Sequence, residues 1–300
     1  MILMYHNVWP EDGPTGHQYQ SITLLASQFE RQIGWLSRFF DILPMAEYLQ
    51  RSAEPGKRRD HMALTFDDGT GITYEVAAPI MARRNIPATF FVSTCQVDSG
   101  PLIWGGYLNA LCFEEQYTEI EHHGEKLALR SEADRRAART ALTRLAVESG
   151  DPRKFAEELS RRLPISEDIF RYYRGMTSRQ IQEAASNPLF DIGAHSVHHY
   201  ALSRLGHDKM ASEVMESGQV LERITGKKTE YFAYPSGDYD MNTIECLKEC
   251  GYSAGFAVRS RRLAEDTDYE IPRMGAYGTP RLLAKMWLYR MGFAYQDYAI

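Results

Sequence analysis

Short apolar runs alternate with amphipathic stretches along most of the chain. The short runs are predicted to be strands, and the stretches with apolar residues every three to four positions are predicted to be helices. The expected strands are residues 2–5, 61–66, 88–93, 190–194, 230–234 and 253–258. The expected helices are residues 27–40, 73–84, 207–226 and the segment before Gly251, and Ser27 with Glu30 would open the first of them as a capping box. This alternation implies parallel strands, in an open sheet or a (β/α) barrel.

Residues from about 102 to 173 interrupt this rhythm. Between 125 and 162 the chain is rich in Arg, Glu, Ala and Leu and shows no strand pattern, which predicts two or three surface helices inserted between barrel units. We favour the interpretation that these helices expose a solvated, charged face over the interpretation that they form a lid or a docking subdomain. A further amphipathic helix is expected at about 280–293, where it would pack on the barrel or rest on a membrane surface.

Composition narrows the class of protein. The chain has 300 residues, 44% hydrophobic and 25% charged, which excludes a disordered or collagen-like protein and suits one domain over residues 1–300. A net charge of −6 argues against nucleic-acid binding. No apolar stretch is long enough to span a bilayer, the N-terminus lacks a signal-peptide pattern, and the four cysteines suggest no disulfide framework. We therefore expect a reduced, cytoplasmic protein.

Two adjacent carboxylates, Asp67 and Asp68, follow the strand expected at 61–66 and precede Gly69. This places them at the carboxyl end of a strand, where α/β proteins keep their active sites. Adjacent carboxylates repel each other, and a metal, a base or a turn must offset that cost. Taken alone, the pair is equally consistent with an Asx turn and with a functional site.

Three histidines cluster directly after the strand expected at 190–194. His195 and His199 are four residues apart, and in a helical turn that spacing puts both imidazoles on one face, as in helix-borne zinc pairs. His198 would then point elsewhere and is not expected to be a ligand. The remaining histidines, His17, His61, His122, His123 and His207, are expected to be structural or on the surface.

A third strand ends in Tyr234-Pro235-Ser236-Gly237, whose glycine permits close approach to a ligand. Together, residues 65–69, 195–199 and 232–237 resemble three motifs of the polysaccharide deacetylase (NodB-homology, carbohydrate esterase 4) family. Residues 4–6 and 271–274 are similar to the start and end of one branch of it. The resemblance covers most of the chain except the inserted helices, and it implies an α/β fold, a distorted (β/α) barrel with fewer than eight regular units.

The resemblance also implies a site. A divalent metal, preferably zinc, would be held by Asp68, His195 and His199, and Asp67 would be the general base for the attacking water. The turn of Tyr234, Pro235, Ser236 and Gly237 would bind substrate, with the Ser236 N–H stabilising the oxyanion. The inserted helices would shape substrate access and would stay outside the metal site.

Two departures from the family pattern concern charge and acid catalysis. Many members carry an arginine where this chain has Ala233, and Arg273 would supply that positive charge near Asp67. No histidine follows His207, so the usual C-terminal proton donor is absent. His6 is our candidate for the acid, with two alternatives left open: His6 packs the barrel core, or Asp67 both accepts and returns the proton.

These observations predict a metal-dependent hydrolase that removes the acetyl group from an N-acetylated amino sugar during surface polysaccharide or glycolipid synthesis. The sugar would be free, nucleotide-linked or lipid-linked, and peripheral contact with the inner membrane would go through the C-terminal helix. One alternative is a deformylase or another amidohydrolase on the same metal site. The other is an inactive carbohydrate-binding barrel.

Overall fold

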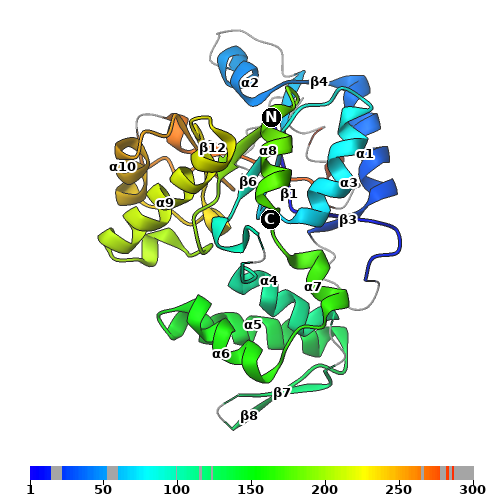
Figure 1. The fold of residues 1–300 in the computed structure, drawn as a ribbon, viewed down its shortest axis with the longest axis vertical. Helices are drawn as coiled ribbons and strands as arrows, with labels where there is room; N and C mark the ends of the chain where they lie inside the picture. Colours follow the sequence, from blue (N-terminus) through cyan, green and yellow to red (C-terminus); the bar gives the residue numbers. More distant parts are fainter. Residues whose placement is uncertain are drawn as a thin grey trace.

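A parallel sheet at the centre of the molecule is wrapped by helices, and a second group of helices lies below it in Figure 1. The computed structural model describes residues 1–14, 22–52, 60–98, 100–114, 117–122, 124–264 and 267–277, with residues 282, 283 and 286. The strands of the sheet's main path are β1 (Ile2–Tyr5), β5 (His61–Phe66), β6 (Ala88–Val92), β9 (Phe190–Ala194), β10 (Tyr231–Ala233), β11 (Ala254–Ala257), β12 (Ile271–Pro272) and β13 (Met274–Gly275).

The sheet curves until its two edges share one segment of chain. Its order is β12-β11-β10-β9-β6-β5-β1-β13, and the pairs along it are parallel. The two outermost strands, β12 and β13, are separated only by Arg273. β12 pairs with β11, and β13 pairs with β1, so residues 271–275 bridge the two edges in a nearly closed barrel. The predicted barrel class is thereby confirmed.

Helices cover the outside of the barrel, as strand–helix alternation predicts. They are α1 (Ala26–Phe39), α2 (Met45–Ser52), α3 (Gly71–Ala82), α8 (Ser178–Ser186), α9 (His207–Thr225) and α10 (Met241–Glu249). Beside the barrel, three short strands stand aside from the main path: β2 (Asn7–Trp9) pairs with β3 (Thr23–Leu25), and β4 (Asp41–Ile42) pairs with β5.

Side chains along each strand alternate between the barrel interior and the helices. In β5, Leu64 and Phe66 join the core formed with the surrounding helices, whereas Ala63 joins a separate interior cluster with Phe91 and Phe256. This period of two residues carries past the strand end and points Asp67 inward. Burial in both layers explains why the strands are nearly continuous apolar runs.

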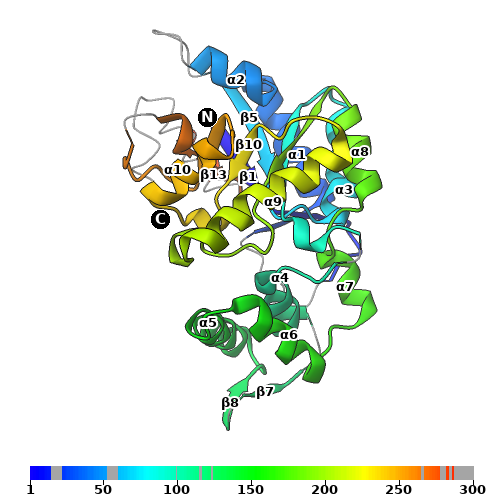
Figure 2. The same ribbon diagram turned by 60° about the vertical axis from the view of Figure 1, so that its left-hand side comes forward.

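The insertion forms a second packed unit beneath the barrel (Figure 2). Its elements are α4 (Trp104–Asn109), a π-helical turn η2 (Ala110–Glu114), β7 (Glu119–His122), β8 (Glu125–Ala128), α5 (Glu132–Glu148), α6 (Pro152–Arg162) and α7 (Glu167–Tyr173). Leu108, Leu111, Leu142 and Leu159 are among the residues of its own buried core. The insertion is therefore more than the solvated helix face that we favoured.

Two local predictions were wrong. The segment from residue 125 was expected to lack strands, but β7 and β8 form an antiparallel hairpin, whose outward residues are charged and hide the alternation. The first helix was expected to be capped by Ser27 and Glu30, but it begins at Ala26, and the Gln28 side chain accepts from the Leu25 N–H at 3.0 Å.

The helix predicted at 280–293 lies almost wholly outside the described residues. Of its residues, Leu282, Leu283 and Met286 are described and helical, and Leu282 and Met286 are buried in the main core. None of the described helices combines the length and apolarity that a membrane span would require.

Candidate metal centre and active site

The carboxyl ends of the barrel strands meet at one edge of the sheet, and the predicted site residues lie there. Asp67 and Asp68 follow β5, His195 follows β9, and His6 follows β1. Backbone pairing continues past the strands, because the Asp67 N–H donates to the Tyr5 carbonyl at 2.9 Å. The polar residues after each strand are thus held level with one another.

Asp68, His195 and His199 converge on one point. Their candidate ligand atoms all lie within 4.8 Å of one another. Asp68 Oδ1 is 3.6 Å from His195 Nε2 and 3.4 Å from His199 Nε2. His195 Nδ1 lies 2.8 Å from the Ala233 carbonyl, which can only accept, so Nδ1 carries a proton and Nε2 points toward Asp68.

The donor set fits a divalent cation. Asp68 Oδ1 is buried and has no hydrogen-bond partner among the described residues, although both imidazoles face it. Burial acts to raise the pKa of Asp68, but the two imidazoles outweigh it and hold that pKa well below its usual value. Burial likewise acts to lower the pKa of His199, and Asp68 raises it overall. One carboxylate oxygen and two imidazole nitrogens are a ligand set typical of catalytic zinc.

The loop that carries the two histidines is not the helical turn that their spacing suggested. Ser196 and His199 both have left-handed backbone, with φ of 60° and 57°. The His199 N–H donates to Ser196 Oγ at 2.9 Å, which helps to offset the cost of that conformation. The two imidazoles therefore converge because the chain turns tightly between them, and not because they share one face of a helix.

The turn after β5 is equally constrained. Asp68 has φ of 70°, and its carbonyl accepts from Gln96 Nε2 at 2.5 Å. Gly69 follows with φ of 71°, and a Cβ there would lie 2.9 Å from the Cα of Val92. Only glycine lets this turn pack against β6. The turn then sets the direction of the Asp68 side chain.

Asp67 lies in the barrel interior against Arg273, as the sequence analysis expected. Two guanidinium nitrogens of Arg273 contact the two Asp67 oxygens at 2.5 and 2.7 Å, and Thr65 Oγ1 lies 3.1 Å from the same guanidinium. Arg273 is 1% exposed and Asp67 is 3% exposed. Burial acts to raise the pKa of Asp67, but the charge of Arg273 leads the contributions that lower it below its usual value. The residue that closes the barrel thus keeps Asp67 ionised.

His6 faces the same cavity as the metal cluster. It lines this cavity with Asp68 and His199, and its Nδ1 lies 2.5 Å from the hydroxyl of Tyr277. Burial lowers the pKa of His6, and the nearby carboxylates Asp68 and Asp67 only partly offset that effect. The imidazole is therefore within the site and is predominantly neutral near pH 7.

The turn after β10 contributes one residue to the cavity. Among the four residues predicted to bind substrate, Ser236 lines the cavity and has φ of 56°. Tyr234 is buried instead: its hydroxyl donates to the Tyr269 carbonyl at 2.8 Å, and its ring stacks on Tyr239. Pro235 is also buried. Their positions make Tyr234 and Pro235 supports of the turn, and Ser236 remains the candidate substrate contact.

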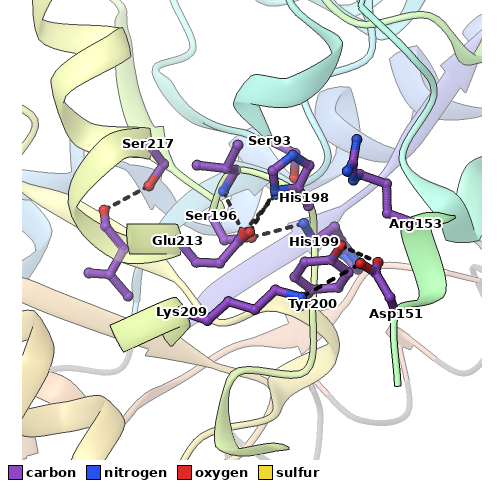
Figure 3. A network of polar contacts seen from close by, with 12 residues as sticks. Ser93, Asp151, Arg153, Ser196, His198, His199, Tyr200, Lys209, Glu213 and Ser217 are labelled. Carbon is purple, nitrogen blue, oxygen red and sulfur yellow. Dashed lines mark hydrogen bonds and ion pairs between the residues drawn. The ribbon is translucent and has the colours of Figure 1, made fainter. Parts of the chain in front are cut away.

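A glutamate of α9 anchors the histidine loop from the barrel side (Figure 3). The Glu213 carboxylate accepts from the Val197 N–H at 3.0 Å and from the His198 N–H at 2.7 Å, and it lies 2.6 Å from His198 Nδ1. Glu213 is 4% exposed. His198 thus points away from the cluster, as predicted, and serves to fix the loop between His195 and His199.

The insertion anchors the same loop from the opposite side. Trp104 of α4 donates from Nε1 to the His199 carbonyl at 2.9 Å. Tyr200 donates to Asp151, which precedes α6, at 2.7 Å (Figure 3). Sequence reasoning missed Trp104, Asp151 and Glu213, because each reaches the loop across a long separation in the chain.

Barrel and insertion residues together line a cavity of 560 Å³ beside the cluster. The barrel lines it with His6, Asp68, His199 and Ser236 among others; the insertion lines it with Ile103, Gly105, Gly106, Asn109, Phe113, Arg136, Arg139, Thr140, Thr143 and Tyr173. His122 is outside the cluster and packs on Phe155, and His123, like His17, lies outside the described residues. The insertion therefore borders the site, and no described residue of it belongs to the metal cluster.

Comparison with known families shows to which family the chain belongs. The family model for polysaccharide deacetylase matches residues 54–255, more than half of the chain. The chain belongs to the polysaccharide deacetylase family. The matched segment contains the Asp67–Asp68 pair, the histidine loop and the turn at Ser236, while His6 and Arg273 lie outside it.

Relatives share this fold at low sequence identity. A Bacillus subtilis (strain 168) protein named "Putative polysaccharide deacetylase YxkH" is 24% identical over 267 residues, which are 88% of this chain. The chain spans 66% of the length of that relative. The structure resembles the Streptococcus pyogenes deacetylase PplD, solved in complex with acetate, at 18% identity and a TM-score of 0.55 over 95% of this chain and 96% of that one. It also resembles IcaB from Ammonifex degensii at 18% identity and a TM-score of 0.57, over 94% and 97% of the two chains.

Proposed function

We propose that the protein is a metal-dependent hydrolase that removes the acetyl group from an N-acetylated amino sugar. The observation that carries this proposal is the Asp68, His195 and His199 cluster, which lies at the barrel edge beside the ionised Asp67–Arg273 pair. Membership of the polysaccharide deacetylase family supports the class of reaction. We place this activity in the synthesis of a surface polysaccharide or glycolipid.

Asp68, His195 and His199 would hold one divalent cation, preferably zinc. The bound cation supplies Lewis-acid chemistry, because it polarises the acetamide carbonyl and lowers the pKa of water. The chain's own contribution is to keep Asp68 ionised, to fix the His195 tautomer through Ala233, and to hold the loop of His199 from two sides. These contacts preorganise the ligands before the cation binds.

Asp67 would take the proton from the attacking water. Arg273 orients the carboxylate and keeps it ionised across the neutral range, because it lowers the pKa of Asp67 despite burial. The backbone N–H of Ser236 would donate to the oxygen that becomes negative during attack. The left-handed backbone at Ser236 belongs to the turn that lines the cavity.

The departing amine must receive a proton, since an unprotonated amine is a poor leaving group. His6 is the imidazole that shares the cavity with the cluster, and we assign it the donor role. Because its pKa is lowered, only the protonated fraction of His6 would donate to the amine, and Asp67 would later release the proton that it took from the water. In the competing scheme Asp67 returns that proton directly, and His6 only orients neighbouring groups.

The decisive assay measures the released acid. Protein stripped with a chelator and reloaded with zinc should release acetate from N-acetylated amino sugars, and the stripped protein should not. Matched N-formyl and N-acetyl substrates separate the deacetylase from a deformylase, because formate release with no acetate would favour the latter. A zinc-loaded protein that binds the sugars and releases neither acid would contradict the proposal and support an inactive carbohydrate-binding barrel.

A further inference from the structure

One wall of the cavity comes from a single face of α5. Arg136, Arg139, Thr140 and Thr143 all line the cavity, and their spacing of three, four and seven residues puts them on one side of the helix. Figures 1 and 2 show α4 between α5 and the barrel. Gly105 of α4 lies against this wall, because a Cβ there would be in ordinary van der Waals contact with the Arg139 guanidinium at 3.7 Å.

Arg139 is held in a fixed position at this wall. Its Nε donates to Asn109 Oδ1 at 2.6 Å, one terminal nitrogen donates to the Gly105 carbonyl at 3.4 Å, and the other contacts the Thr143 hydroxyl. The side chain is only partly buried, so its charge still faces the cavity. A guanidinium that is already oriented loses little side-chain entropy when it binds an anion.

Arg136 lies one helical turn before Arg139 and is more exposed. It pairs with Glu132 at 2.6 Å, and both side chains are largely exposed, at 48% and 64%. A pair this exposed contributes little to stability, so an incoming dianion can compete for the guanidinium. The Thr140 and Thr143 hydroxyls donate to helix carbonyls one turn back, which leaves anion recognition to the two arginines.

This wall is basic although the chain carries a net charge of −6. Side chains three residues apart on a helix have Cβ atoms roughly 5–6 Å apart, so two guanidiniums can grip one phosphate or two neighbouring phosphates. The cavity volume of 560 Å³ lies within the range of small-molecule sites, about 300–1,000 Å³. Asp68 and His199 of the barrel and the two arginines of the insertion line this same cavity.

We propose that the α5 wall binds the phosphate of a substrate in which the N-acetylated amino sugar is esterified to phosphate or diphosphate. This inference rests on the proposed function for the acetamide end and adds the chemical class of the remainder of the substrate. The phosphate ester comes from a nucleotide or from a polyprenyl carrier, and both sources present the same group to Arg136 and Arg139.

The test compares UDP-N-acetylglucosamine, a short polyprenyl diphosphate N-acetylglucosamine and free N-acetylglucosamine. Binding is measured by isothermal titration, and acetate release gives kcat/KM for each compound. We expect a phosphorylated sugar to be preferred, and we expect R136Q/R139Q to reduce that preference at least roughly tenfold. R139K should retain part of the preference, because it keeps the charge and loses the oriented guanidinium, and affinity for the phosphorylated sugar should fall with added salt.

Arg144 provides the matched control. It lies on the same helix, pairs with Glu148 in the same i,i+4 manner, and is not among the residues that line the cavity. R144Q should leave the substrate preference unchanged. The proposal would be overturned if R144Q and the double variant lost the preference equally, or if the wild-type protein treated the three sugars alike. A preference for a carboxylated amino sugar over the phosphate esters would overturn it as well.

Failure of this inference is distinguishable from failure of the proposed function. If no substrate releases acetate, the titrations still show whether the arginines bind phosphate. If acetate is released equally from neutral and phosphorylated sugars, deacetylation stands and the phosphate site does not. The two phosphorylated compounds separate the sources, because only the polyprenyl arm responds if the carrier lipid is also recognised.

Discussion

The barrel and the insertion meet at one cavity, yet they contribute different kinds of group to the candidate site around it. The barrel supplies buried, tightly paired groups: Asp67 and Arg273 are at most 3% exposed, and His195 is 2% exposed. The insertion supplies partly exposed arginines and two hydrogen bonds to the histidine loop. Groups that would act on the acetamide thus sit at rigid strand ends, and groups that would select the substrate sit on a separately packed unit.

This difference teaches where each property of the site can change. A buried pair such as Asp67–Arg273 tolerates little substitution, because removal of one partner leaves the other charge buried and uncompensated. Arg136 is exposed and Arg139 is only partly buried, so their replacement should cost less stability than the loss of one partner of a buried pair. The insertion can therefore alter specificity while the barrel keeps its chemistry, provided that the shared loop stays anchored.

The largest effect is expected from the barrel side. Asp67→Asn should retain zinc and lose about 10²–10⁴-fold in turnover, since it removes the general base. The amide keeps an acceptor oxygen for Arg273 but removes the compensating charge, so circular dichroism must first show that the variant is folded. Turnover and zinc content are measured together, and near-wild-type turnover at full zinc content would show that Asp67 is not the base.

His6→Ala sharpens the assignment of the acid. If His6 donates the proton, turnover should fall about 10²-fold, at the low end for acid catalysis, and KM should change less. Because the pKa of His6 is lowered from 6.5, the part of the pH–rate profile in which activity falls as His6 loses its proton should lie below pH 6.5. The variant should lose that part of the pH–rate profile; an unchanged profile and turnover would leave Asp67 acting alone.

The insertion carries a pH-sensitive group of its own. Burial raises the pKa of Glu114 to about 7, against the opposing effects of Tyr173 and Arg135, and its Oε2 has no hydrogen-bond partner among the described residues. Between pH 4.5 and 7 the folded protein keeps a proton that the unfolded chain has lost, so stability should fall as pH rises.

Glu114→Gln should remove this dependence. Between pH 4.5 and 8 the wild type should lose roughly 3 kcal/mol of unfolding free energy that the variant keeps. This difference corresponds to about a hundredfold change in the unfolding equilibrium constant. Urea unfolding at the two pH values measures this. Glu148→Gln on exposed α5 surface is the control, and an identical pH dependence in wild type and Glu114→Gln would refute the account.

The smallest effects are expected where the two regions share the histidine loop. Glu213→Gln and Trp104→Phe should each weaken zinc binding by about 10–100-fold, since they loosen the loop without removing a ligand. Glu213→Gln should have the larger effect, because the carboxylate holds three groups and the indole holds one. Competition titrations measure zinc affinity.

Matched controls exist for both loop variants. Glu216→Gln changes an exposed glutamate of the same helix α9, and Trp35→Phe changes a tryptophan that is 37% exposed on α1. Both should bind zinc as wild type does. Wild-type zinc affinity in Glu213→Gln and Trp104→Phe would mean that the loop holds its shape without these anchors.

The sequence revealed the barrel residues far better than the residues that support them. Adjacent carboxylates after an apolar run, and two histidines four apart, are local patterns, and the structure brings Asp68, His195 and His199 together. Arg273 was placed beside Asp67 through the family resemblance, and the ion pair is present.

Support that depends on long separations left no local pattern. Glu213 contacts the loop from 15 or 16 residues away, and Trp104 from 95 residues away. Tyr234 occupies a motif, yet its ring turns into the core, because only the packing of Tyr239 and the Tyr269 carbonyl determine its direction. The separate core of the insertion was hidden because its surface is so strongly charged.

The central claim is that Asp68, His195 and His199 hold one divalent cation, and zinc stoichiometry tests it most directly. Purified protein, dialysed after zinc loading, should contain one zinc per chain by elemental analysis. His195→Ala and His199→Ala should lose that zinc, whereas His207→Ala, at an exposed helix start, should retain it, with circular dichroism to confirm that each variant is folded. Retention of stoichiometric zinc by folded His195→Ala and His199→Ala would contradict the account.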